Sequence, residues 1–91
     1  MCVIVTRDVP ARFRGFLASC MLEIAPGVYT QPDMSAAVRE RVWKVLRDWW
    51  IHYTQGSVVM TWAAPATDER QQVATLGEPA KELIDYEGMY V

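Results

Sequence analysis

The chain has 91 residues, of which 52% are apolar, and carries a formal net charge of −2. This length has room for one small domain over residues 1–91, and the slightly acidic balance excludes a protein that is basic over its whole surface. No apolar run is long enough to span a bilayer, and no leader with a cleavage site precedes the first predicted strand. We therefore expect a cytoplasmic protein with no membrane partner.

The charges are distributed unevenly along the chain. Residues 1–50 contain seven Lys/Arg and five Asp/Glu, whereas residues 51–91 contain two and six. A site for a phosphate group is therefore expected to be local and to lie in the N-terminal half. The four Trp and four Tyr are many for so small a core, which indicates that some apolar surface contacts a partner subunit.

The first predicted elements are a strand and a helix. Residues 2–6 are apolar and largely β-branched, which is typical of a short buried strand. From Phe13 to Ile24 the apolar residues recur at helical spacing, and Pro10 is well placed in a first helical turn. The sequence Ala25-Pro26-Gly27 predicts the end of this helix.

The remaining elements complete a predicted α+β fold. A second helix is expected from about Ser35 to about Tyr53, with Asp33 or Ser35 as its cap. Strands are expected at residues 28–30, 57–64 and 70–76, and residues 83–91, with a turn at Glu87-Gly88, form the end of the chain with a short extra strand. The order β-α-β-α-β-β, with a short extra C-terminal strand, predicts a ferredoxin-like sandwich. Two helices would cover one face of the sheet, and the other face would make a homodimer contact.

The junction between the first strand and the first helix carries an unusual set of charges. Arg7, Arg12 and Arg14 surround the helix N-terminus, and only Asp8 offsets them. A helix N-terminus favours acidic side chains, so stability alone does not select this arrangement. Free N–H groups together with guanidinium groups suit an anion, above all phosphate. The alternative interpretation is a solvated surface on which arginines are tolerated.

Asp8 also has two interpretations. As a carboxylate at a strand end it could share a Mg²⁺ ion with substrate phosphates, because Mg²⁺ keeps several waters and needs few protein ligands. In a two-fold dimer it would have a symmetry mate. The simpler alternative is a helix cap, or a local partner of Arg7 or Arg12.

Five stretches follow one another in an order and spacing typical of one known family. They are Thr6-x-x-Val9-Pro10-x-Arg12-x-Arg14-Gly15-x-Leu17, Glu23-Ile24-x-x-Gly27-Val28-Tyr29, Ser35-x-x-Val38-Arg39-Glu40-x-x-Trp43, Gly56-x-Val58-Val59-Met60-x-Trp62-Ala63 and Ile84-Asp85-x-Glu87-Gly88. Through these stretches, which cover almost the whole chain, the sequence resembles the small CRISPR-associated adaptation protein Cas-two of type I-E systems.

The resemblance implies a ferredoxin-like protomer that forms a homodimer through its sheet and acts in prokaryotic antiviral immunity. In that family the dimer bridges two dimers of the Cas-one integrase. It also binds the backbone of the double-stranded protospacer DNA that is integrated into the CRISPR array. Arg12 and Arg14 match arginines that contact this backbone, and Lys81 matches a basic residue that also contacts DNA.

The sequence departs from the family at two other basic positions. Ala37 and Ala80 stand where relatives carry basic residues. Further DNA contacts are therefore expected from Arg7 and from Arg39 or Arg41.

The wider family is also described as metal-dependent nucleases of single-stranded RNA or duplex DNA, with an acid at the end of the first strand as the metal ligand. Arg7 is closest to that register, and Asp8 lies one place further on. The resemblance thus implies an alternative function, a Mg²⁺-dependent endonuclease with Asp8 as catalytic residue and metal ligand. A DNA-binding scaffold without catalysis is the preferred prediction.

Overall fold

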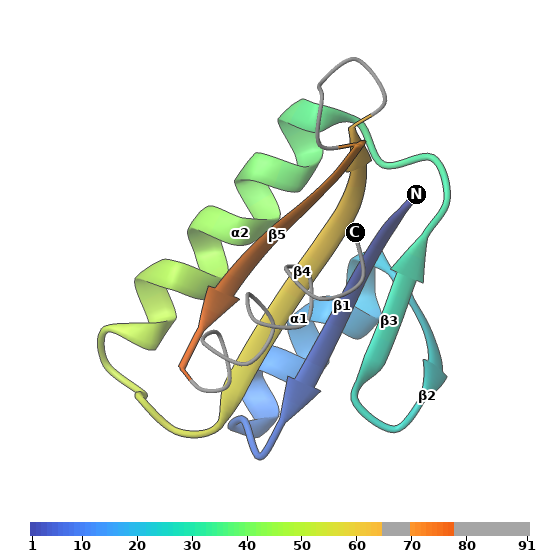
Figure 1. Ribbon diagram of the computed structural model, residues 1–91. Helices are drawn as coiled ribbons and strands as arrows, with labels where there is room; N and C mark the ends of the chain where they lie inside the picture. The colour runs from blue at the N-terminus through green and yellow to red at the C-terminus, as the bar shows by residue number, and fades with distance from the viewer. Residues whose placement is uncertain (65–69, 78–91) are drawn as a thin grey trace, which may run out of the picture.

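The computed structural model describes residues 1–64 and 70–77, and these form an α+β fold with two helices and one five-stranded sheet (Figure 1). The elements in chain order are β1 (Cys2–Arg7), α1 (Ala11–Cys20), β2 (Leu22–Ala25), β3 (Val28–Gln31), α2 (Ala36–Trp50), β4 (Ser57–Ala64) and β5 (Arg70–Leu76).

The sheet places β1 at its centre. The strand order is β2-β3-β1-β4-β5, and every neighbouring pair is antiparallel. Both helices lie on the same face of this sheet (Figure 1). This arrangement is compatible with the predicted ferredoxin-like sandwich. The expected short C-terminal strand lies outside the described residues.

The first helix is shorter than the sequence predicts. It ends at Cys20, Met21 is extended with φ −138° and ψ 164°, and the segment predicted as its last turn is strand β2. Gly27, with φ 77°, makes the turn that pairs β2 with β3. The apolar residues of this segment continue the helical spacing, but only Met21 is buried, whereas Leu22 and Ile24 are 67% and 59% exposed. The segment pairs with β3 as a strand, and this pairing outweighs its helical spacing.

The predicted strands at 28–30, 57–64 and 70–76 and the second helix are confirmed, although α2 ends at Trp50 and not at about Tyr53. Helix α2 begins after Ser35, whose Oγ accepts a hydrogen bond from the Val38 N–H at 3.2 Å, so Ser35 is the cap. Strands β4 and β5 occupy the predicted residues. Within the described part of the chain β5 is the edge strand next to β4, as its polar composition indicates.

The core lies between the sheet and the helices. In the central strands Ile4 is paired with Tyr29 on one side and Met60 on the other, and all three are buried. The alternate positions face the opposite side of the sheet. There Val5 is paired with Val28 and Val59, and Val5 is 41% exposed. The described helices include none with the length and apolar character needed to cross a membrane.

Candidate nucleic-acid interface

The chain leaves β1 through a tight reversal at Asp8. Asp8 has φ 57°, the only positive φ of a non-glycine residue among residues 1–64 and 70–77. Gly56, with φ 80°, packs its backbone against this turn, and a Cβ there would overlap the Arg7 carbonyl oxygen and lie 2.6 Å from the Asp8 carbonyl. Glycine is therefore required at position 56, and its close approach holds Asp8 in the left-handed conformation.

Helix α1 begins three residues later without a side-chain cap. Its N-cap is Pro10, no side chain accepts a hydrogen bond from the first turn, and that turn contains no acid. The interpretation of Asp8 as the helix cap is therefore wrong. Nor does Asp8 pair with Arg7 or Arg12, because the single ion pair within residues 1–64 and 70–77 joins Lys44 and Asp48 at 3.2 Å.

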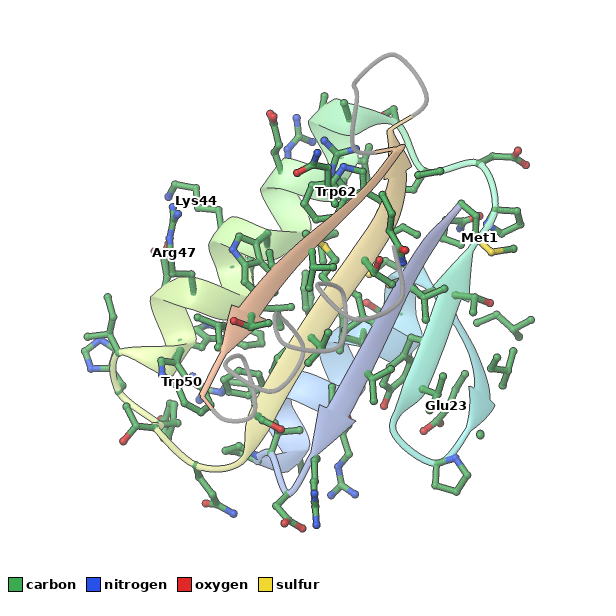
Figure 2. All side chains as sticks on the ribbon, in the orientation of Figure 1. Met1, Glu23, Lys44, Arg47, Trp50 and Trp62 are labelled. Carbon is green, nitrogen blue, oxygen red and sulfur yellow. The ribbon has the colours of Figure 1, made fainter. Side chains whose placement is uncertain are left out.

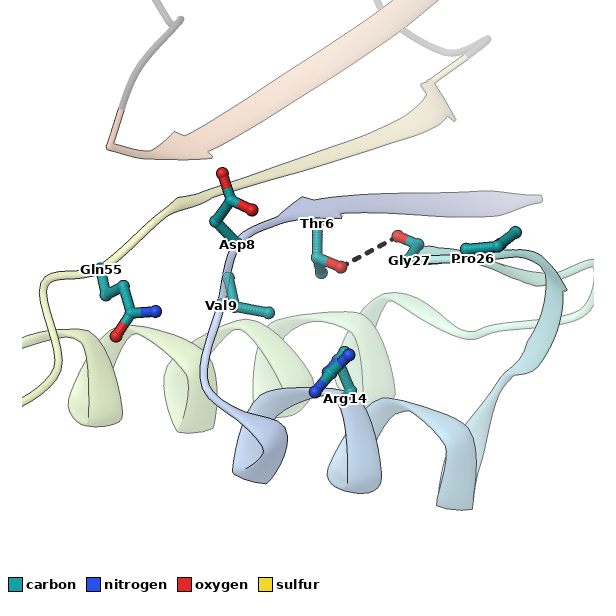
Figure 3. Close-up of a pocket in the computed structure, with 7 residues that line it drawn as sticks. All are labelled: Thr6, Asp8, Val9, Arg14, Pro26, Gly27 and Gln55. Carbon is teal, nitrogen blue, oxygen red and sulfur yellow. Dashed lines mark hydrogen bonds between the residues drawn. The ribbon is translucent and has the colours of Figure 1, made fainter.

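A groove of about 510 Å³ lies between the end of β1, the start of α1 and the β2–β3 turn (Figure 3). The Thr6 hydroxyl donates a hydrogen bond to the Gly27 carbonyl at 3.1 Å, which ties β1 to the turn. Arg14 extends from α1 and forms part of the wall of this groove, while the Asp8 carboxylate points away from that helix. The residues lining the groove are Thr6, Asp8, Val9, Arg14, Pro26, Gly27 and Gln55.

Arg12 points elsewhere, although it is only two positions from Arg14. Residues two apart on an α-helix face directions about 200° apart. The Arg12 guanidinium carbon lies 5.5 Å from the Trp49 ring centroid and 5.2 Å from that of Tyr53. The two arginines therefore flank the start of α1 on different sides.

Arg39 does not join this cluster. Its guanidinium carbon lies 4.4 Å from the Trp62 ring centroid, and Trp62 pairs with Cys2 at the beginning of β1. Burial raises the pKa of the Cys2 thiol, and the nearby Arg39 charge opposes that rise. Arg7 stands at the other end of the same strand, about 17 Å away at the usual rise per residue. The predicted basic residues thus form two separate groups.

A family comparison gives these observations their biological context. The model of the family described as CRISPR-associated protein (Cas_Cas2CT1978) matches residues 1–91. The chain belongs to this Cas2 family. The resemblance to Cas-two inferred from the sequence is confirmed, and it supports a CRISPR-related role.

The Cas2 chain brings no large set of metal ligands together in its described part. Within residues 1–64 and 70–77 no three His, Cys, Asp or Glu side chains gather at one place. A Mg²⁺ ion at the end of β1 would have the Asp8 carboxylate as its ligand from this part of the chain. Waters, substrate phosphates or a second copy would supply the other ligands. Lys81, the remaining predicted DNA contact, lies outside the described residues.

The sequence did not reveal Glu23 as a support of the groove. Its Oε2 accepts a hydrogen bond from the Gly27 N–H at 3.1 Å. Burial raises the pKa of Tyr29, Glu23 raises it further through its charge and a side-chain hydrogen bond, and the Arg14 charge opposes the rise. Glu23 therefore supports the hairpin turn that carries Gly27, one of the residues that line the groove (Figure 2). In the sequence, the pair Pro26-Gly27, which is typical of a turn, was the signal that could have indicated this hairpin.

Trp49 and Tyr53 stand four residues apart, a spacing typical of two side chains on the core face of a helix. The structure gives them a further contact. Trp49 is half-buried and Tyr53 is 40% exposed, and both rings contact Arg12. A basic residue near one helix start and an aromatic pair near the end of the other are far apart in the sequence, so no local pattern predicts the contact.

Proposed function

We propose that this Cas2 chain is a CRISPR adaptation protein that binds the backbone of protospacer DNA. The observation that carries the proposal is the group of exposed arginines Arg7, Arg12 and Arg14 around the start of α1. None of them forms an ion pair with the described residues, and the helix start has neither an acid nor a side-chain cap. Guanidinium groups and free helix N–H donors suit phosphate oxygens.

The proposal includes a homodimer that bridges integrase dimers. The face of the sheet opposite the helices supports it, because no helix of residues 1–64 and 70–77 lies on that face and Val5, Val28 and Val59 offer neighbouring apolar side chains to a second copy. Replacing Val5 by Lys should shift sedimentation at micromolar concentration from dimer to monomer. Val38→Lys is a matched control, because Val38 is 42% exposed on α2 and Val5 is 41% exposed on the sheet. A wild-type monomer would contradict the bridging role.

The DNA contact is tested by the salt dependence of duplex binding. Each phosphate neutralised by an arginine adds about one to the slope of log affinity against log salt. A two-fold dimer presents each arginine twice, so Arg12→Ala or Arg14→Ala should lower the slope by about two per dimer. Because phosphates carry no sequence information, unrelated duplexes should lose affinity equally.

Arg70→Ala is the control for this experiment. Arg70 pairs with Ala64 at one end of β4, whereas Arg7 pairs with Ser57 at the other end, about 23 Å away. Its removal should leave the slope unchanged. If both Arg12 and Arg14 can be removed without changing affinity or slope, the start of α1 is not the DNA site. Co-purification with the neighbouring integrase and a short duplex tests the assembly.

The alternative function is a Mg²⁺-dependent endonuclease acting on single-stranded RNA or duplex DNA. The observation that favours it is the backbone of Asp8, which has a positive φ of 57° and packs against Gly56. Strained backbone conformations of this kind are concentrated at functional sites. Asp8→Asn should abolish metal-dependent cleavage if Asp8 binds the ion. Cleavage that persists in Asp8→Asn would exclude this role for Asp8, and unchanged duplex binding would support the scaffold. Lys81 as a DNA contact and a cytoplasmic location stay predictions.

A further inference from the structure

Arg12 is the one arginine at the start of α1 for which the described residues provide two aromatic contacts. Its guanidinium carbon is 5.5 Å from the Trp49 ring centroid and 5.2 Å from the Tyr53 ring centroid. Both distances are within the range of a cation–π interaction. We infer that Trp49 and Tyr53 are positioning residues that hold the Arg12 guanidinium ready for a DNA phosphate. This inference rests on the proposed DNA-binding function.

The aromatic pair is itself held in place. The Trp49 ring makes edge-on contacts with Phe13 and Phe16, at centroid distances of 5.7 and 5.4 Å. The backbone N–H of Tyr53 donates a hydrogen bond to the Trp49 carbonyl at 3.0 Å, so the chain is still turning where Tyr53 begins. Residues four apart on a turning chain lie on one side of it, which places both rings beside Arg12.

The Arg12 guanidinium forms no ion pair with the described residues, so its hydrogen-bonding groups stay available beside the rings. A guanidinium contacts an aromatic ring through its flat face, while its N–H donors lie in its own plane and point outward. Arg12 can therefore keep both ring contacts and still donate two hydrogen bonds to one phosphate. The C-terminal end of α2, next to Tyr53, also favours a cation.

Holding a long side chain before binding reduces the entropy lost on binding. Immobilising a flexible side chain at an interface costs enough to change affinity by about two- to ten-fold. Arg14 makes no cation–π contact among residues 1–64 and 70–77, although its charge acts on Tyr29, so no described ring holds its guanidinium in the way that Trp49 and Tyr53 hold that of Arg12. Arg12 and Arg14 should therefore contribute to affinity by different routes, although each carries one positive charge.

Tyr53 is the residue to change, because it is exposed, whereas Trp49 packs against the core. Tyr53→Ala should weaken duplex binding by about two- to ten-fold for each Arg12 that contacts DNA. Tyr53→Phe keeps the ring and should bind as the wild type does. In an Arg12→Ala background, Tyr53→Ala should cause no further loss. Thermal melting identifies a variant that fails to fold, and Tyr53→Leu then replaces Tyr53→Ala.

A second measurement needs no DNA. Nitrogen-15 relaxation of the Arg12 Nε–H should show restricted motion in the wild type and in Tyr53→Phe, and freer motion in Tyr53→Ala. Equal mobility in all three proteins would overturn the inference.

The binding outcomes separate this inference from the proposed function. If Tyr53→Ala weakens binding equally with and without Arg12, Tyr53 contacts DNA itself and does not act through Arg12. If Arg12→Ala weakens binding but Tyr53→Ala does not, the inference fails and the DNA site stands. If Arg12→Ala has no effect, Arg12 is not a DNA contact, and the inference fails with that part of the proposed function.

Discussion

The two helices of this Cas2 chain begin in opposite ways. Helix α2 follows Ser35, whose hydroxyl satisfies the Val38 N–H, and its start is thus stabilised within the chain. Helix α1 follows Pro10, and no side chain in its neighbourhood accepts a hydrogen bond from its first turn. A side chain therefore caps one helix, whereas no described side chain caps the other, in which the Phe13 N–H donates to the Pro10 carbonyl at 3.0 Å.

What holds the start of α1 is the surrounding backbone instead of a cap. Gly56 packs against the turn at Asp8, and Thr6 donates two hydrogen bonds to the Gly27 carbonyl, from its N–H at 2.7 Å and from its hydroxyl at 3.1 Å. The turn is thus held by the neighbouring strands and glycines, while no described side chain caps the helix. A helix start can therefore be held by the packing of neighbouring backbone without a side-chain cap.

The largest expected effect comes from Gly56→Ala. A Cβ at this position would overlap the Arg7 carbonyl oxygen, and alanine disfavours the φ of 80°. We expect the free energy of unfolding to fall by about 2–4 kcal/mol in urea denaturation. Gly15→Ala is the control, because Gly15 lies within α1 with open space around it, and this change should raise stability by about 0.5–1 kcal/mol. A harmless Gly56→Ala would show that the turn is not held by close approach.

The next effect concerns the capped helix. Ser35→Ala removes the acceptor of the Val38 N–H and should cost about 1 kcal/mol of unfolding free energy, measured by thermal or urea denaturation. Ser35→Asp keeps an acceptor and should restore stability. The contrast with α1 would disappear if Ser35→Ala were neutral.

A smaller effect separates the two arginines on α1. Judged by charge at the helix N-terminus alone, removal of either arginine should leave stability unchanged or slightly raised. The contacts of Arg12 with Trp49 and Tyr53 change this expectation for Arg12. Arg12→Ala should lower stability by about 0.5 kcal/mol, because the lost ring contacts exceed the relieved repulsion. Arg14→Ala should not lower it, and equal effects in thermal melting would contradict a specific role for the rings.

Much of this architecture could be predicted because the deciding signals are local. The β-branched strand β1, the Ser35 cap and the apolar strand β4 each lie within a few neighbouring residues. The segment before Pro26 was predicted wrongly because its spacing suits a helix, and only pairing with β3 decides for a strand. A strand that forms only because it pairs with another strand cannot be predicted from the residues of that segment alone.

The residues of the site also divide into those that local sequence predicts and those that only the fold brings together. Arg7, Arg12 and Arg14 were found because they lie close together in sequence beside a predicted helix start. The approach of Gly56 to Asp8 was not found, because residues 48 positions apart meet only through the pairing of β1 with β4. Arg39 was grouped with the others by charge alone, and the sheet separates it from them.

The smallest expected effect is that of Asp8→Asn, which tests the turn through Asp8 itself. Asn tolerates the left-handed conformation about as well as Asp, and the Asp8 carboxylate has no ion-pair partner in the described residues, so Asp8→Asn should change stability by less than about 0.5 kcal/mol. Asp8→Ala should cost about 1 kcal/mol, because alanine disfavours a φ of 57°. Glycine at this position should restore the loss, since it reaches positive φ without strain. If Ala, Asn and Gly gave equal urea midpoints, backbone conformation would not be the property that position 8 requires. If Asp8→Asn and Asp8→Gly both lowered the free energy of unfolding, the Asp8 carboxylate itself would have a stabilising role.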